Sequence, residues 1–210
     1  MAELAVVTGA SSGIGFSLAK ELASRGYDLL ICSEGERLDS AAQELKSMGV
    51  QVKPVHANLA TRDGVDQLWR AVDACSRPVD IACINAGVGA PREAVYAATK
   101  AFGLSFAHSL RYELKDTGIS VTALQPGPTD TDFFHRAGLD NTEVGTKGRQ
   151  QSQPDDVAKE GIDALLSGKD HVYSHSMSTK LEGMTANFVP GAVKGAMHEK
   201  QTKPLDKKSA

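Results

Sequence analysis

A tyrosine and a lysine lie four residues apart in the segment YAATK, as Tyr96 and Lys100. On a helix, residues four apart share one face, so the phenol and the ammonium group would be neighbours. A phenol has a pKa of about 10 and is a poor acid or base at neutral pH, but a nearby positive charge favours its ionised form. The pair is therefore a candidate for proton transfer to or from a substrate oxygen. The competing interpretation is an aromatic ring packed on a lysine stem.

A glycine-rich segment, TGASSGIG (8–15), follows the apolar run LAVVT (4–8) and leads into a helical pattern. Gly9 would allow a sharp turn, Gly13 a close approach of the backbone to a ligand, and Gly15 close packing of helix on strand. Free N–H groups at the start of the helix would then face a phosphate group. Tight strand-to-helix turns also use glycine for steric reasons alone, but the flanking strand and helix favour a dinucleotide site.

Around these segments, short β-rich runs alternate with helical patterns. Strands are expected at 4–8, 27–33, 50–57 (interrupted at Pro54), 79–85, 119–125 and 171–174, and helices at 13–26, 35–49, 61–75, 92–116 and 154–168. This alternation predicts an α/β fold, a doubly wound and mostly parallel sheet of the Rossmann type with helices on both faces. We expect one domain over 1–190 and a basic C-terminal tail over 191–210.

Four motifs, in this order, resemble the short-chain dehydrogenase/reductase family: TGASSGIG, NAG (85–87), YAATK and PGPTDT (126–131). The match covers 3–131 and extends to about 174 by pattern alone. The resemblance implies an NAD(P)-dependent oxidoreductase that transfers a hydride between nicotinamide and a carbonyl or secondary alcohol. Tyr96 would exchange the proton, and Lys100 would hold the nicotinamide ribose and favour the ionised phenol.

The same resemblance assigns the cofactor contacts. Ser33 stands where members that prefer NADP often carry arginine, and no acid stands directly at the strand end. We therefore expect a weak preference for NADP, although Glu34 and Arg37 leave NAD open. Asn58 stands where the family usually has an aspartate near the adenine, and could equally be a turn residue. The expected contacts are Thr8, Gly9, Ser11, Ser12, Gly13, Ile14, Gly15, Ser33, Asn58, Leu59, Asn85, Ala86, Gly87, Tyr96, Lys100, Pro126, Gly127, Thr129 and Thr131, the last at the nicotinamide carboxamide.

The connection between two of these motifs is unusually short. Only nine positions separate Gly87 from Tyr96, whereas complete family members have another helix and strand there, and such a passage takes about 30 residues. The strand would carry the catalytic serine, and the helix would carry a proton-relay asparagine and part of the usual dimer interface. The segment VGAPREAV (88–95) holds no Ser, Thr or Asn. We expect an internal deletion, with the cofactor half (3–87) intact and the catalytic half incomplete; a sequence from which residues were omitted would look the same.

Two foldings of this connection are conceivable. The strand at 119–125 could keep its family position and leave a gap beside 79–85, or it could move in beside that strand. In the second case Tyr96 would shift by about 4.8 Å, one strand spacing, and a displacement of about 1 Å can already cost roughly 100-fold in rate. Both foldings predict weakened catalysis.

The composition excludes several other classes. The 210 residues carry a net charge of −3 and no apolar run of bilayer length, so neither a nucleic acid nor a membrane is expected as a partner. Three cysteines without pairing motifs and six scattered histidines predict buried reduced thiols and no metal site; His171 and His175 lie on extended chain. We expect a cytoplasmic protein with a small carbonyl or alcohol substrate, and a homo-oligomer is possible.

Three functions remain open from the sequence. The first is the oxidoreductase, the second a nucleotide-binding protein with impaired or no catalysis, and the third a marginal fragment without stable tertiary structure. The substrate would depend mostly on the loop 126–150 and on the weakly patterned residues after 174. In the loop, Phe133 and Phe134 could wall a pocket for an apolar substrate or cap the edge of the sheet.

Overall fold

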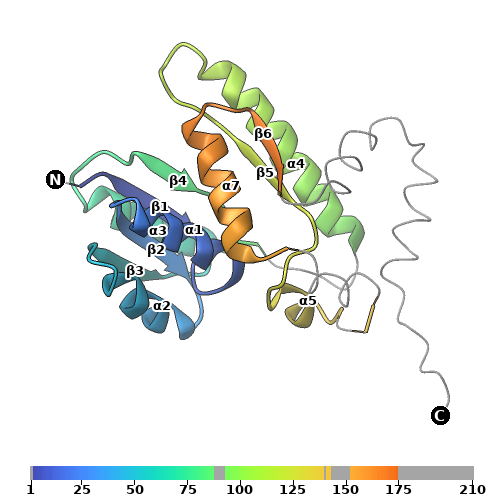
Figure 1. Cartoon of the computed structure of the whole chain (residues 1–210), viewed down its shortest axis with the longest axis horizontal. Coiled ribbons are helices and arrows are strands. Elements are labelled where there is room, and N and C mark those ends of the chain that lie inside the picture. The colour runs from blue at the N-terminus through green and yellow to red at the C-terminus, as the bar shows by residue number, and fades with distance from the viewer. Residues whose placement is uncertain (1, 88–92, 140, 143–151, 175–210) are drawn as a thin grey trace. The chain divides into compact units, whose positions relative to one another are not determined.

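The computed structural model describes residues 2–87, 93–139, 141–142 and 152–174, and the chain divides into two compact units. The first is Met1–Gly87 and the second Val88–Ala210 (Figure 1). The division falls at the short connection between the NAG and YAATK motifs, where a helix and a strand are expected to be missing.

The first unit is built on a four-stranded parallel sheet. Its strands are β1 (Leu4–Thr8), β2 (Asp28–Ser33), β3 (Val52–His56) and β4 (Ile81–Cys83), in the order β3-β2-β1-β4. All three pairings are parallel, and β1 is paired on both sides. Every residue of β1 is buried, as its continuous apolar character predicts for a strand covered on both faces.

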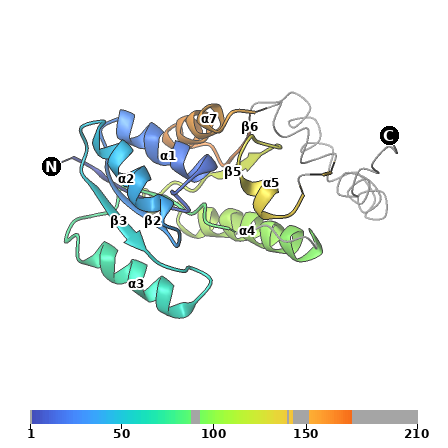
Figure 2. The same ribbon diagram turned by 90° about the horizontal axis from the view of Figure 1, so that it is seen from below.

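Helices cover both faces of this sheet. Figure 2 shows α1 (Gly13–Ser24) and α2 (Arg37–Lys46) on one face and α3 (Arg62–Asp73) on the other. Right-handed crossovers require this arrangement, because the chain steps from β1 to β3 in one direction and then returns to β4. Leu68 and Val72 of α3 pack against a buried cluster that the strands supply from Leu4, Val6, Leu30, Cys32 and Val55.

Two details of the first unit differ from the sequence expectations. Pro54 does not interrupt the third strand, because β3 is an edge strand, where a residue without an N–H group is tolerated. The fourth strand is shorter than 79–85. Other signals are confirmed: the Thr61 side chain accepts the hydrogen bond from the Gly64 N–H and caps α3, and Gly26, just beyond α1, has φ +87°.

The second unit contains a two-stranded parallel sheet and three described helices. The elements are α4 (Glu93–Glu113), β5 (Ala123–Pro126), α5 (Phe133–Arg136), α7 (Pro154–Leu166) and β6 (His171–Ser174), with β5 paired to β6 (Figure 1). Gly161 lets α7 approach the sheet, since a Cβ there would lie 2.9 Å from Leu124 Cδ2. The Arg111 guanidinium ties the end of α4 to the chain around β5 and β6 by donating to the carbonyls of Val121 and Gly168, each at 2.8 Å.

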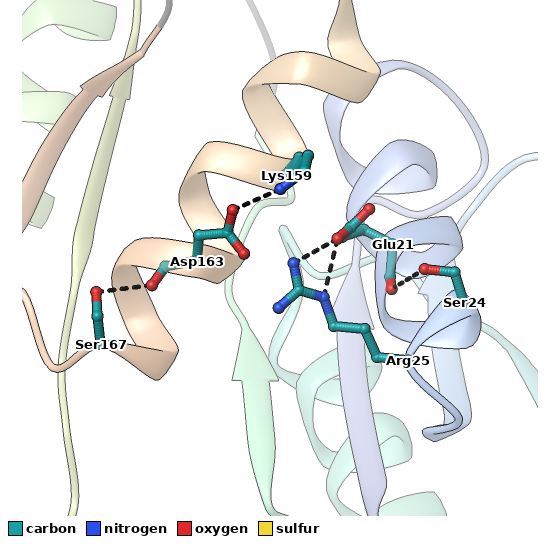
Figure 3. Close-up of polar contacts among 6 residues, drawn as sticks. All are labelled: Glu21, Ser24, Arg25, Lys159, Asp163 and Ser167. Atoms are coloured by element: carbon teal, nitrogen blue, oxygen red, sulfur yellow. Dashed lines mark hydrogen bonds and ion pairs between the residues drawn. The ribbon is translucent and has the colours of Figure 1, made fainter.

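Polar contacts on single helices add to local order in each unit (Figure 3). At the end of α1, Nε of the C-cap residue Arg25 donates to Glu21 Oε1 at 2.8 Å, an (i, i+4) ion pair. In α7, Lys159 Nζ donates to Asp163 Oδ2 at 2.7 Å. Just beyond the helix, the Ser167 hydroxyl donates to the Asp163 carbonyl and so satisfies one of its last carbonyl groups. Such pairs stabilise a helix by only about 0.2–0.5 kcal/mol each, so packing remains the main source of stability.

The predicted fold class is confirmed: parallel strands alternate with helices in a Rossmann-type arrangement. The strand expected at 119–125 begins later, at Ala123, and extends to Pro126. Within the first unit β4 pairs with β1, and within the second β5 pairs with β6, so the two foldings considered for the short connection both stay predictions. No helix in the described ranges is both long and apolar enough to cross a membrane.

Candidate active site

The turn after β1 is closed by two glycines packed against Asn85. Gly9 has φ +70°, which side chains rarely adopt, and its N–H donates to the Cys32 carbonyl at 2.8 Å. A Cβ on Gly15 would lie 2.2 Å from the Gly9 carbonyl oxygen and 2.4 Å from Asn85 Nδ2. The first turn of α1 therefore lies directly on the end of β1, at a distance that only glycine permits.

The start of α1 has the properties of an anion site. Ser12, the N-cap residue, is extended (φ −171°), and its side chain makes no capping hydrogen bond. The first turn carries no acidic side chain. The first N–H groups of a helix have no partner within the helix and carry partial positive charge, so this end of α1 suits a phosphate.

The NAG motif is held to Thr8, the last residue of β1. The buried Thr8 hydroxyl oxygen accepts hydrogen bonds from the backbone N–H groups of Asn85 (2.9 Å) and Ala86 (3.0 Å). The Asn85 side-chain amide donates in return to the Thr8 carbonyl at 3.1 Å. These bonds join the ends of β1 and β4, so the expected contact residues of both motifs lie together at one edge of the sheet.

The residues expected near the adenosine also lie at this edge. Ser11 Oγ and Ser33 Oγ are 2.9 Å apart, which joins the glycine-rich turn to the end of β2. Asn58 Nδ2 donates to Glu34 Oε1 at 2.9 Å, and Asn58 Oδ1 accepts from the Ala60 N–H at 2.9 Å. Asn58 thus makes an Asx-type turn, one of the two roles considered for it, and also holds a carboxylate beside Ser33.

In the second unit, Tyr96 and Lys100 share a face of α4 as the spacing predicts. Lys100 Nζ lies 5.4 Å from the centre of the half-buried Tyr96 ring, a cation–π distance. The Phe133 ring, from α5, lies 5.5 Å from the Tyr96 ring, centre to centre, with an angle of 46° between the ring planes. The structure is compatible with both interpretations of the pair, because the lysine packs on the ring and remains close enough to act on the phenol, and the Phe133 ring contacts the same phenol.

The PGPTDT segment forms a turn that its own side chains stabilise. Thr129, which is buried, donates from Oγ1 to the Gly127 carbonyl at 2.9 Å. Thr131 Oγ1 accepts from the Phe133 N–H at 3.3 Å. The residue expected at the nicotinamide carboxamide thus also sets the start of α5, where Phe133 lies.

The structure brings the expected site residues together in two groups, one in each unit. The residues from Thr8 to Gly87 lie at the ends of β1, β2, β3 and β4 in the first unit. Those from Tyr96 to Thr131 lie on α4, at the end of β5 and in the turn after it in the second unit. Sequence reasoning missed two partners, the Glu34 carboxylate on Asn58 and the Phe133 ring on Tyr96. Neither contact has a fixed spacing in the chain, so only the fold reveals it.

Other reactive groups do not form a competing site in the described residues. Burial raises the pKa of the Cys83 thiol to about 12 and also raises the pKa of Cys32, so neither supplies a thiolate at neutral pH. All three cysteines are free thiols. No group of three or more His, Cys, Asp and Glu residues that could hold a metal ion occurs in the part of the chain that the structure describes.

Comparison with known proteins shows one family and one fold. The family model described as short chain dehydrogenase matches residues 3–94 and 88–142. The 1-deoxy-11-beta-hydroxypentalenate dehydrogenase of Streptomyces exfoliatus is 28% identical over 230 aligned positions, which cover 82% of each chain. Two solved structures share the fold: a short-chain dehydrogenase from Sphingobium yanoikuyae in complex with NADPH (TM-score 0.72, 23% identity, 97% of this chain and 99% of that one), and a short-chain dehydrogenase/reductase from Burkholderia phymatum in complex with NAD (TM-score 0.71, 18% identity, 100% and 98%).

The family model reaches from the first strand through the glycine-rich turn, the YAATK helix and the PGPTDT turn, and its matches together span more than half of the chain. The chain therefore belongs to the short-chain dehydrogenase family of oxidoreductases.

Proposed function

We propose that this chain binds NADP or NAD through its first unit, and that Tyr96 and Lys100 support hydride transfer between the nicotinamide and a small carbonyl or secondary alcohol. The observation that carries the proposal is the close packing of Gly15 on Gly9 and Asn85. This packing brings the uncapped start of α1 to the end of β1, the place where a doubly wound sheet receives a pyrophosphate.

The bound nicotinamide would supply or accept the hydride. Lys100 would hold the nicotinamide ribose, and its ammonium charge beside the Tyr96 ring would favour loss of the phenolic proton. In the direction of reduction, the Tyr96 hydroxyl would donate its proton to the carbonyl oxygen of the substrate, and in the direction of oxidation it would accept the alcohol proton. The backbone of the turn at 126–131 would border the nicotinamide.

The choice between the two cofactors depends on the end of β2. Ser33 places no acid at the strand end, which is compatible with NADP. The Glu34 carboxylate, held by Asn58, could accept a hydrogen bond from a free ribose hydroxyl and would repel a 2′-phosphate, which supports NAD. Both cofactors therefore belong in the binding experiment.

A second candidate function is nucleotide binding with impaired or absent turnover. The chain lacks Ser, Thr and Asn between Gly87 and Tyr96, so no serine from this segment can orient the substrate oxygen. The side chains of Val95, Phe102 and Phe106 on α4 are 67%, 72% and 56% exposed, as expected if an element that normally covers the helix is missing. The alignment with the pentalenate enzyme has 230 positions but covers only 82% of this chain, about 172 residues. About 58 aligned positions therefore hold no residue of this chain, which supports a deletion.

Titration with NADPH and NADH, followed by an assay over a panel of aldehydes and ketones, tests both functions. The oxidoreductase requires cofactor-dependent turnover that Tyr96→Phe abolishes. The nucleotide-binding function requires cofactor binding that Gly13→Val removes, with no turnover for any substrate in the panel. If neither cofactor binds the folded wild-type chain, both proposals fail.

The intact mass tests the deletion directly. A chain of 22.2 kDa that yields a peptide running unbroken from Asn85 through Arg92 contains the short connection. A chain heavier by several kilodaltons would contain further residues, and the missing serine could then lie among them.

A further inference from the structure

Three aromatic rings form a cluster at the tyrosine of the YAATK helix. The Phe133 ring lies 5.5 Å from the Tyr96 ring and 5.6 Å from the Phe134 ring, centre to centre, and the two phenylalanines meet edge to face. Both separations are within the range of favourable aromatic pairs. All three side chains are only half-buried, so they present apolar surface beside the phenol.

Phe133 is held in this cluster by the backbone around it. Its N–H donates to Thr131 Oγ1, and its carbonyl accepts from the Ala137 N–H at 2.9 Å. The Phe134 carbonyl accepts from the Leu139 N–H at 2.8 Å, and both Ala137 and Leu139 are buried. The backbone that carries the Phe133 ring is thus held by hydrogen bonds to buried residues, while the ring itself stays partly exposed to solvent. A contact surface for a ligand requires both properties.

The apolar surface of these rings is a candidate for orienting the substrate, because the segment between Gly87 and Tyr96 offers no polar group for that role. A carbonyl that accepts a proton from the Tyr96 hydroxyl must be held in place, and no hydroxyl or amide side chain between Gly87 and Tyr96 can hold its oxygen. Its substituent would lie within van der Waals reach of a ring packed on the same phenol. An apolar substituent gains from that contact, whereas a hydroxylated or charged one would lose hydration without a partner.

We propose that Phe133 is a specificity-determining residue, whose ring packs against the substituent of the substrate, so that the site takes carbonyl compounds with an aryl or bulky alkyl substituent in preference to polyhydroxylated ones. This inference rests on the proposed oxidoreductase function. The alternative role of Phe133 is to cap the edge of the sheet without touching a ligand. In that case the rates for both substrates in the experiment below would not change when the ring is removed.

The experiment compares benzaldehyde with glyceraldehyde as substrates, using NADPH or NADH. Phe133→Ala should lower kcat/KM for benzaldehyde at least about tenfold, mainly through a higher KM, because loss of apolar contacts in a substrate pocket typically costs 10- to 200-fold. The loss of kcat/KM for glyceraldehyde should be much smaller than the loss for benzaldehyde, because glyceraldehyde has no apolar substituent to pack on the ring. Phe133→Leu, which keeps apolar volume, should restore a large part of the benzaldehyde activity, and glyceraldehyde turnover by Phe133→Ala shows that this variant folds.

The matched control is Phe102→Ala, on the same helix as Tyr96. Phe102 is 72% exposed and stacks on Phe106 with ring centres 6.1 Å apart, so its loss should leave both substrates unaffected. An equal loss for both substrates in Phe133→Ala would show that Phe133 only positions Tyr96, and an unchanged rate for both would show that it is a cap. Either result overturns the inference.

A binding measurement separates this inference from the proposed function. If the wild-type chain turns over neither aldehyde, the oxidoreductase proposal fails, and benzaldehyde binding is then measured by ligand-observed NMR. Binding that is lost in Phe133→Ala and kept in Phe102→Ala still supports the apolar site at Phe133. Equal binding by all three chains, binding lost only in Phe102→Ala, or no binding to any of them overturns it.

Discussion

The hydroxyl oxygen of Thr8 accepts hydrogen bonds from two consecutive backbone N–H groups, those of Asn85 at 2.9 Å and Ala86 at 3.0 Å. The same hydroxyl lies 3.3 Å from the Cys83 carbonyl, to which it donates. One side chain thus holds the NAG motif to the first strand, and the motif in turn closes the glycine-rich turn through Asn85. We expect the conformation of the glycine-rich turn to depend on this hydroxyl.

Thr8→Val, which keeps the shape but removes the hydroxyl, should destabilise the first unit by about 1–3 kcal/mol, because two N–H groups lose their partner at a buried position. Cofactor affinity should fall with it. Hydrogen exchange of the peptides covering β1 and β4 measures the first effect, and cofactor titration the second. Thr8→Ser retains the hydroxyl and should keep the stability of the first unit and the cofactor affinity close to wild type. Equal behaviour of the two variants would show that the hydroxyl is not required.

Gly15→Ala should disrupt the turn although alanine is the best helix former. The added Cβ would lie 2.2 Å from the Gly9 carbonyl oxygen, a backbone atom that can move only if α1 moves off β1. We expect loss of measurable cofactor binding and a lower melting temperature. Gly103→Ala is the control, since a Cβ there meets nothing within 4 Å; in an exposed helix interior it should stabilise by about 0.5–1 kcal/mol. Normal cofactor affinity in Gly15→Ala would refute the proposed phosphate site.

Glu34→Gln should raise the affinity for NADPH relative to NADH. The substitution keeps the length and polarity of the side chain while removing a negative charge next to Ser33, and a 2′-phosphate would no longer be repelled. The expected change in the affinity ratio is on the order of tenfold at low salt, and smaller at high salt, where the charges are screened. Glu44→Gln, elsewhere in the same unit, is the control. An unchanged ratio would show that Glu34 does not lie near the adenosine ribose.

Thiol alkylation at pH 8 tests whether the first unit is stably folded. Cys32 and Cys83 are buried, and burial raises the pKa of each thiol, that of Cys83 to about 12, whereas Cys75 is partly exposed. Reaction of the two buried thiols requires local opening, so both should react with iodoacetamide at least about 100-fold more slowly than Cys75. In denaturing urea the three rates should converge. Similar rates without urea would support the third possibility from the sequence, a fragment without stable tertiary structure.

The parts of the fold that the sequence predicts well are those determined by local patterns. The continuous apolar run at 4–8 and the capping residue Thr61 predict β1 and the start of α3, because burial and capping leave a direct signature in residue type. Pro54 misleads because its effect depends on whether β3 is an edge strand, which is a property of the whole sheet. The Tyr96–Phe133 contact likewise joins residues 37 positions apart, and no periodicity reports it.

Arg111 should stabilise the second unit more than any exposed ion pair does. Its guanidinium donates to the carbonyls of Val121 and Gly168 at 2.8 Å, so one planar group joins α4 to the chain before β5 and before β6. Arg111→Lys keeps the charge but offers a single ammonium in place of the guanidinium fork, so it should recover only part of the loss of about 1–3 kcal/mol expected for Arg111→Ala. Hydrogen exchange in the peptides covering β5 and β6 measures the effect. Arg62→Ala is the control, because Arg62 is 93% exposed and lies 4.0 Å from its partner Asp66. If Arg111→Ala exchanged no faster than Arg62→Ala in these peptides, the two-stranded sheet would not depend on the guanidinium, and the packing of α7 on the sheet would have to hold it instead.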